Sequence, residues 1–172
     1  MSDTSAPRVP VRITVCDTDE TLRPASLLFD RYRQHYGRPD ADGRALPWLR
    51  DMVRSGLLTV WTASDPDGAP DGAPVGLATA HPVPASLALG RSWQLRDLFV
   101  LPAARRRGTA ATLVDAVRDA ARAAGATRLS LVTETDNRPA LDLYQRLGFT
   151  PVEGYVTLGL DLGRASEPPA PC

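Results

Sequence analysis

Hydrophobic residues in the first half of the chain recur with two different spacings, and these spacings predict its strands and helices. Apolar residues alternate with polar ones over 11–15, which predicts a strand, and recur every four positions over 25–36, which predicts an amphipathic helix. A second helix is expected from about Ala45. Two β-rich runs, 57–63 and 75–81, follow on either side of a doubled Asp-Gly-Ala-Pro unit, whose turn residues predict a hairpin.

The second half of the chain alternates between strand and helix patterns. It predicts a strand at 93–101, an Ala-rich helix ending near Ala124, a strand at 128–133, a helix capped by Asn137 and a β-rich run over 149–162. The order β-α-α-β-β-β-α-β-α-β predicts an α/β fold with a mixed central β-sheet flanked by helices. We expect a single domain over 11–162 between flexible ends at 1–10 and 163–172, because those ends have too few apolar residues to pack.

The strand at 93–101 carries an acid inside an apolar pattern. Strict alternation places four side chains on one face of it: Trp93, Leu95, Asp97 and Phe99. A carboxylate is rarely buried on an apolar face without a specific role, so Asp97 is the first candidate for a general base. An equal alternative is that a neighbouring Arg or backbone group pairs with this carboxylate. His81, at the end of an earlier strand, is the second candidate, against the commoner role of a hydrogen-bonded packing residue.

Composition narrows the classes of function. Twenty basic and twenty acidic residues cancel, so we expect neither a nucleic acid nor a membrane as partner, and any anion site must be local. The chain contains no Lys, which excludes Schiff-base chemistry and a P-loop lysine. Its two cysteines, Cys16 and Cys172, have no metal-ligand spacing and form a poor disulfide candidate. We therefore expect no metal and a cytoplasmic location.

A basic turn joins the strand at 93–101 to the Ala-rich helix. It reads Arg105-Arg106-Arg107-Gly108-Thr109-Ala110. The first N–H groups of a helix have no partner within the helix and lie at the positive end of its dipole, so they accept phosphate oxygens, and the small residues Gly108 and Ala110 leave room for close approach. Taken alone, the same motif is also compatible with a solvent-exposed helix start whose arginines bind no ligand. Neither a P-loop nor a dinucleotide-binding glycine pattern is present.

Three motifs follow one another over 93–149: Leu-Arg-Asp-Leu-Phe-Val-Leu-Pro, the Arg-x-x-Gly-x-Ala turn, and Asn137-x-x-Ala140-x-x-x-Tyr144-x-x-x-Gly148-Phe149. Together they resemble the GCN5-related N-acetyltransferase (GNAT) family. The resemblance implies the acyl-CoA N-acyltransferase fold and transfer of an acetyl group from acetyl-CoA, the cosubstrate, to a primary amine. The sequence departs from the family at Ala110 and Arg106, where Gly is common.

The resemblance also assigns roles to residues. It implies that the Val100 N–H polarises the thioester carbonyl and that the phenol of Tyr144 protonates the departing thiolate as general acid. The residues that it implies for the cofactor are Leu98, Phe99, Val100, Arg105, Arg106, Arg107, Gly108, Thr109, Ala110, Ala111, Asn137 and Tyr144.

The acceptor side is predicted to involve the first two helices and nearby strand ends. The candidate substrate contacts are Tyr32, Tyr36, Trp93, Asp97 and Glu134. Aromatic and acidic side chains suit a cationic amine, although tyrosines at helical spacing are more often core residues. A small-molecule acceptor leads, and polyamine, aminoglycoside, amino acid, peptide N-terminus and protein lysine all stay open. The alternatives are a catalytically silent acyl-CoA-binding regulatory module and a protein or peptide N-acetyltransferase. Family habit suggests a homodimer.

Overall fold

The computed structural model describes residues 10–65 and 72–162. The two ends predicted to be flexible therefore lie outside the described residues, apart from residue 10. Most of the doubled Asp-Gly-Ala-Pro loop lies outside them as well.

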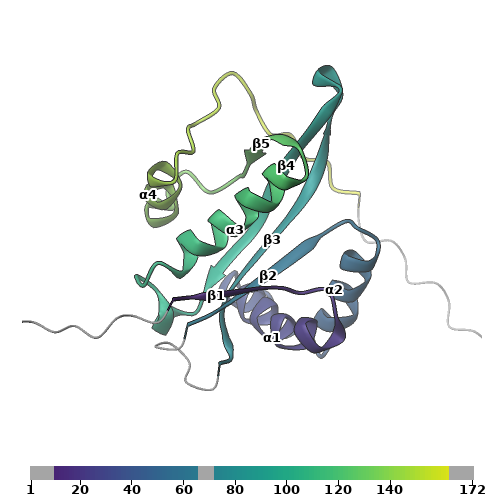
Figure 1. The fold of residues 1–172 in the computed structure, drawn as a ribbon, viewed down its shortest axis with the longest axis vertical. Helices are drawn as coiled ribbons and strands as arrows, with labels where there is room; N and C mark the ends of the chain where they lie inside the picture. The colour runs from purple at the N-terminus through teal and green to yellow at the C-terminus, as the bar shows by residue number, and fades with distance from the viewer. Residues whose placement is uncertain (1–9, 66–71, 163–172) are drawn as a thin grey trace, which may run out of the picture.

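A five-stranded mixed sheet forms the centre of the molecule (Figure 1). Its strands lie in chain order: β1 (Arg12–Val15), β2 (Thr59–Ser64), β3 (Pro74–Ala85), β4 (Gly90–Val100) and β5 (Ala126–Ser130). The first four pair antiparallel, whereas β5 runs parallel to β4. The predicted α/β fold with a mixed central sheet is confirmed.

Helices cover both faces of the sheet. They are α1 (Asp19–His35), α2 (Ala45–Arg54), α3 (Thr109–Ala123) and α4 (Arg138–Arg146), with short 3₁₀ turns at Ser86–Ala88 and Pro102–Ala104. Figure 1 shows α1 and α2 on one side of the sheet and α3 on the other. Each side buries its own apolar cluster, with Leu22 and Leu49 under α1 and α2 and Leu113 and Val117 under α3.

Helix α1 begins six residues before the predicted start, because a polar cap sets its first turn. The Thr18 side chain accepts from the Thr21 N–H at 3.4 Å, and the Thr21 hydroxyl accepts from the Thr18 N–H at 3.2 Å. Asp19 and Glu20 in the first turn favour the positive end of the helix dipole. The period of apolar residues alone does not show this first turn.

A β-bulge in β4 overturns the predicted face of that strand. Thr79 of β3 pairs with Asp97, and the next residue, Ala80, pairs with Leu95, so Arg96 is an extra residue in the register. The bulge reverses the alternation. Trp93 lies in the cluster under α3, and Phe99 lies in the cluster under α1 and α2. The prediction that these side chains share one face is wrong.

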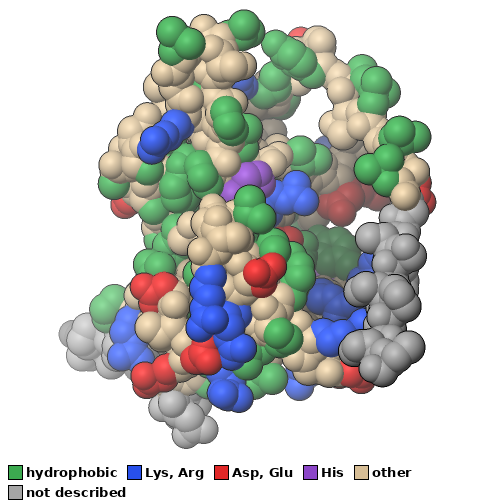
Figure 2. Space-filling view, turned by 90° about the vertical axis from the view of Figure 1, so that its right-hand side faces the viewer, with side chains coloured by type: hydrophobic (Ala, Val, Ile, Leu, Met, Phe, Trp, Pro, Cys, Tyr) green, Lys and Arg blue, Asp and Glu red, His purple; other side chains and the backbone are tan. Residues whose placement is uncertain are grey.

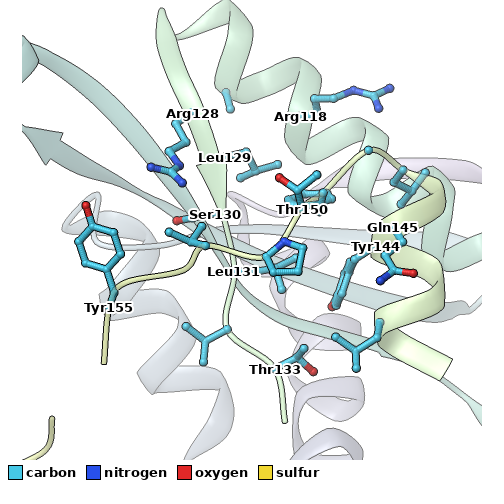
Figure 3. A pocket seen from close by; sticks show the side chains of 18 of the residues that line it. Arg118, Arg128, Leu129, Ser130, Leu131, Thr133, Tyr144, Gln145, Thr150 and Tyr155 are labelled. Carbon is cyan, nitrogen blue, oxygen red and sulfur yellow. The ribbon is translucent and has the colours of Figure 1, made fainter. Parts of the chain in front are cut away.

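The strand predicted over 149–162 is absent from the described residues. This segment stands away from β5 and leaves a pocket of about 910 Å³ between β5, α4 and its own first part (Figure 3). Its apolar side chains, such as Leu158 and Leu160, are exposed. Alternation stabilises a strand only where a neighbouring edge supplies hydrogen bonds, and this segment pairs with none.

Candidate active site

The sheet opens between β4 and β5. The two strands pair only as far as Gln94 and Ser130, and β4 continues alone on that side to Val100. On its other side the Leu101 N–H donates to the Val75 carbonyl at 2.9 Å. Main-chain groups alternate in direction along a strand, so those of Leu98 and Val100 face the open edge. Those of Phe99 face β3, although Phe99 was predicted as a cofactor contact.

The start of α3 lies beside this open edge. Arg105 Nε donates to the Val100 carbonyl at 3.0 Å and so ties the turn to the end of β4. Gly108 is the N-cap residue, with a left-handed φ of 87°, and no side chain caps the helix there. The space around a Cβ built on Gly108 is empty within 4 Å. Uncapped N–H groups at an accessible helix start fit the phosphate oxygens of CoA.

Gly76 of β3 lets α3 approach the sheet closely. A Cβ at this position would lie 2.9 Å from the Leu113 side chain, 3.1 Å from that of Thr109 and 3.4 Å from that of Val100. Any larger residue would push the start of α3 away from β4. No sequence pattern indicates this role, because Gly76 interrupts an otherwise ordinary apolar strand.

Local geometry must supply the affinity for an anion, since charge is spread over the molecule. Figure 2 shows basic and acidic side chains interspersed on one face. At the turn, Arg105 and Arg106 are exposed, and Arg106 has a positive φ of 62°, which is rare outside Gly. The turn is open to solvent, and its residues do not line the pocket beside β5.

Tyr144 extends from α4 toward β5 (Figure 3). Asn137 caps that helix by accepting from the Ala140 N–H at 3.4 Å, so it positions α4 whatever its contact with the cofactor. The Tyr144 ring meets Phe149 edge-on at 5.7 Å. Burial, and then the neighbouring Tyr36 and Glu134, raise the pKa of Tyr144 to about 12. Its phenol is therefore protonated at neutral pH and able to donate.

Asp97 is the centre of a polar cluster on the α1 side of the sheet. Its carboxylate accepts a hydrogen bond from the Thr79 hydroxyl. Burial, followed by the nearby Asp97 carboxylate, raises the pKa of Tyr32. The cluster includes Thr79, which sequence reasoning missed; a hydroxyl in a fully apolar run is the signal that could have found it.

His81 lies near the same carboxylate. Its pKa is lowered below 6.5, first by burial and then by Arg96, while Asp97 acts in the opposite direction. A lowered pKa keeps the imidazole neutral at physiological pH, so it can accept a proton. The bulge residue Arg96 thus has an electrostatic effect that strand alternation does not reveal.

The remaining candidates divide between the site and the core. Tyr36 is 52% exposed and close enough to Glu134 and Arg105 for their charges to act on its pKa, which burial raises. Trp93 is 8% exposed and packs against Trp61 in the cluster under α3. The structure therefore brings together the predicted substrate contacts except Trp93, which faces the other side of the sheet.

Comparison with known proteins agrees with this geometry. The family model of the Acetyltransferase (GNAT) family matches residues 26–149. An uncharacterized N-acetyltransferase of Bacillus subtilis (strain 168), YhfO, is 31% identical over 129 residues, which is 75% of this chain and 83% of that protein. The chain belongs to the GNAT family, and it is an acetyl-CoA-dependent N-acyltransferase.

Solved structures agree in fold. The crystal structure of a "probable acetyltransferase" superimposes with a TM-score of 0.78 at 25% identity, over 91% of this chain and 100% of that one. The structure of AAC(6')-Iy with the bisubstrate analogue CoA-S-monomethyl-acetylneamine has a TM-score of 0.72 at 22% identity, over 89% of this chain and 99% of that one. The predicted acyl-CoA N-acyltransferase fold is confirmed.

No helix within residues 10–65 and 72–162 is long and apolar enough to cross a membrane. Within the same ranges, no three His, Cys, Asp or Glu side chains gather in a group that could hold a metal ion.

Proposed function

We propose that the protein transfers the acetyl group of acetyl-CoA to a primary amine of a small molecule by direct attack. The amine nitrogen bonds to the carbonyl carbon, and the carbon–sulfur bond breaks. The amine loses one proton, and the departing thiolate gains one. We expect this reaction in the cytoplasm, where acetyl-CoA is available.

One observation carries this proposal: the uncapped start of α3 lies at the end of the unpaired edge of β4, and Arg105 Nε joins the two by donating to the Val100 carbonyl at 3.0 Å. Tyr36 lies near enough to Tyr144 to affect the pKa of that phenol, and near enough to Arg105 for the arginine charge to affect its own pKa. A diphosphate at the helix start would therefore direct the rest of CoA along β4 toward Tyr144.

Main-chain groups bind and polarise the donor in this proposal. The N–H groups at the start of α3 hold the pyrophosphate, and the exposed arginines of the turn add positive charge. The open edge at Leu98 and Val100 pairs with the pantetheine arm, and the Val100 N–H polarises the thioester carbonyl. The Tyr144 phenol, in the position of a general acid, donates a hydrogen bond to the sulfur as negative charge develops on it.

The acceptor side uses Asp97 and His81. Asp97, held by the Thr79 hydroxyl, accepts a hydrogen bond from the incoming amine and orients it. His81, neutral because of its lowered pKa, takes the amine proton directly or through water. An alkyl amine is mostly protonated near pH 7, so the ammonium form loses two protons, one before or during attack and one as the amide forms. One of them balances the proton that the thiolate gains, and the other is released to solvent.

A thiol-release assay with acetyl-CoA and a panel of small amines tests the proposal. We expect CoA release that depends on the amine and appearance of the N-acetyl product by mass spectrometry. A reaction without amine measures hydrolysis. Acetyl-CoA binding with no release for any amine would instead favour the silent regulatory module, and release only with peptides would favour a protein N-acetyltransferase.

A further inference from the structure

A second pocket, of about 710 Å³, opens between α1, α2 and the segment that joins them. Pockets of this size hold small organic ligands. It adjoins the catalytic cluster, because Tyr32 and Tyr36 line it. The Tyr32 ring lies 6.0 Å from that of Phe99 on β4, and Tyr32 is close enough to Asp97 for the carboxylate charge to raise the pKa of the phenol. A molecule in this pocket therefore lies against the residues that we place around the amine.

The walls of the pocket are aromatic. Phe29 and Trp48 stack with ring centres 5.2 Å apart and planes at 17°, and Tyr32 lies 5.9 Å from Phe29. Trp48 is 45% exposed, so the stack is open to a ligand. These rings suit the apolar or aromatic body of an acceptor.

The charge of the lining has one sign. Three arginines line the pocket, Arg33, Arg38 and Arg44, and the lining includes no carboxylate. Arg33 is paired with Asp30 at 2.8 Å. Arg44 donates through Nε to the Ala41 carbonyl at 3.0 Å. Within the described residues, the Arg38 side chain makes no hydrogen bond or ion pair, so it and the terminal nitrogens of Arg44 are the cations left for a ligand.

The neighbouring acids do not offset these cations inside the pocket. Asp40 accepts hydrogen bonds from the Gln34 side chain and the Asp42 N–H. Neither Asp40 nor Asp42 lines the pocket. The expectation of a cationic acceptor relied on acidic side chains beside the aromatic ones, and the two acidic candidates, Asp97 and Glu134, do not line this pocket. A polycation in this pocket would bring positive charge against the guanidinium groups of Arg38 and Arg44, which no carboxylate of the described residues pairs.

We propose that the acceptor is an amine that also carries a carboxylate, on an apolar or aromatic body. The carboxylate lies at Arg38 and Arg44, the body lies against the Phe29–Trp48 stack, and the amine faces Asp97. Guanidinium groups recognise carboxylates with paired, charge-assisted hydrogen bonds. This inference rests on the proposed function, since it names the class of substrate for the same site.

Calorimetry in the presence of CoA tests the inference without turnover, because CoA carries no acetyl group. The ligands are phenylalanine and leucine, their amides, and 2-phenylethylamine, with spermidine as the polycation. We expect at least one acid to bind about tenfold more tightly than its amide and its decarboxylated amine, as befits a hydrogen bond to a charged group. Amides or spermidine that bind as well as the acids, or acids that do not bind, overturn the inference.

Variants locate the effect. In Arg38→Gln/Arg44→Gln the ratio of acid to amide affinity should fall to near one. Arg31→Gln, an exposed arginine of α1 that does not line the pocket, should leave the ratio unchanged. An unchanged ratio in the double variant contradicts the placement of the carboxylate.

Thiol release with acetyl-CoA on the same ligands separates this inference from the proposed function. Acid-selective binding without release would contradict catalysis and keep the pocket. Release with no preference for acids would keep catalysis and contradict the pocket.

Discussion

Replacing Tyr144 with Phe removes one hydroxyl from the site and leaves the ring in place. The phenyl ring can keep its edge-on contact with Phe149 at 5.7 Å, so we expect little change in fold or in acetyl-CoA affinity. A loss confined to turnover is therefore the signature of a proton or hydrogen-bond donor.

The raised pKa of Tyr144 sets the size of the effect. With a pKa of about 12 for the phenol and roughly 8.5 for a thiol, complete proton transfer to the thiolate is uphill by about 3.5 units, or ~5 kcal/mol. The phenol therefore acts mainly by donating a hydrogen bond as negative charge develops on sulfur. Such a bond to a charged group contributes about 1.5–3 kcal/mol, which corresponds to a fall in kcat of roughly 10–150-fold.

Rapid-mixing kinetics of thiol release, with acetyl-CoA binding measured by calorimetry, checks this prediction. The absence of a burst establishes that chemistry limits the rate. Under that condition, an unchanged kcat in Tyr144→Phe refutes the donor role. A fall in kcat that acetyl-CoA affinity follows fold for fold refutes it too, because the ring would then serve binding.

Three further predictions follow from the cluster and the core. If His81 is the base, the acid limb of the pH profile of kcat/KM should lie below pH 6.5 in the parent chain. It should shift to higher pH in Arg96→Gln, which removes a charge that lowers the His81 pKa, and vanish in His81→Gln. An acid limb that is the same in both variants as in the parent contradicts His81 as the base. Gly76→Ala should lower the free energy of unfolding by about 1–3 kcal/mol in urea titrations and weaken acetyl-CoA binding, because the added Cβ disturbs the contact between α3 and the sheet. Gly159→Ala, which has open space around its Cβ, should do neither. Equal effects of the two variants would contradict a requirement for Gly at position 76. The folded pKa of Tyr144 lies above the ordinary 10, so the stability that its protonated phenol contributes is complete below about pH 10 and is lost as the pH rises toward 12. Because the chain has no Lys to titrate in this range, the free energy of unfolding of Tyr144→Phe should decline less between pH 9 and 11 than that of the parent chain. An identical decline would contradict the raised pKa.

Sequence patterns predicted the local parts of this structure well. Helix positions with a clear apolar period, the strand before the basic turn and the Asn137 cap are set by residues close in the chain, and all are present. The Arg105–Ala110 turn was found because its chemistry depends on a helix start, which is also local.

Features that depend on partners far along the chain were not predicted. The bulge at Arg96 is a property of the β3–β4 register, and it moves Trp93 and Phe99 to opposite faces. The predicted strand over 149–162 had the right alternation and no paired edge. The hydroxyl of Thr79 reaches Asp97 only through strand pairing.

The central claim is that the start of α3 holds the diphosphate of CoA, and calorimetry of matched glycine variants tests it most directly. Gly108 and Gly125 flank the same helix, both with positive φ, 87° and 73°, and both with open space around a Cβ. A glutamate side chain at either position carries the same backbone strain and charge, but only the one in place of Gly108 would meet the diphosphate. We predict that Gly108→Glu abolishes measurable acetyl-CoA binding while Gly125→Glu keeps it. Undiminished binding in Gly108→Glu would contradict the account.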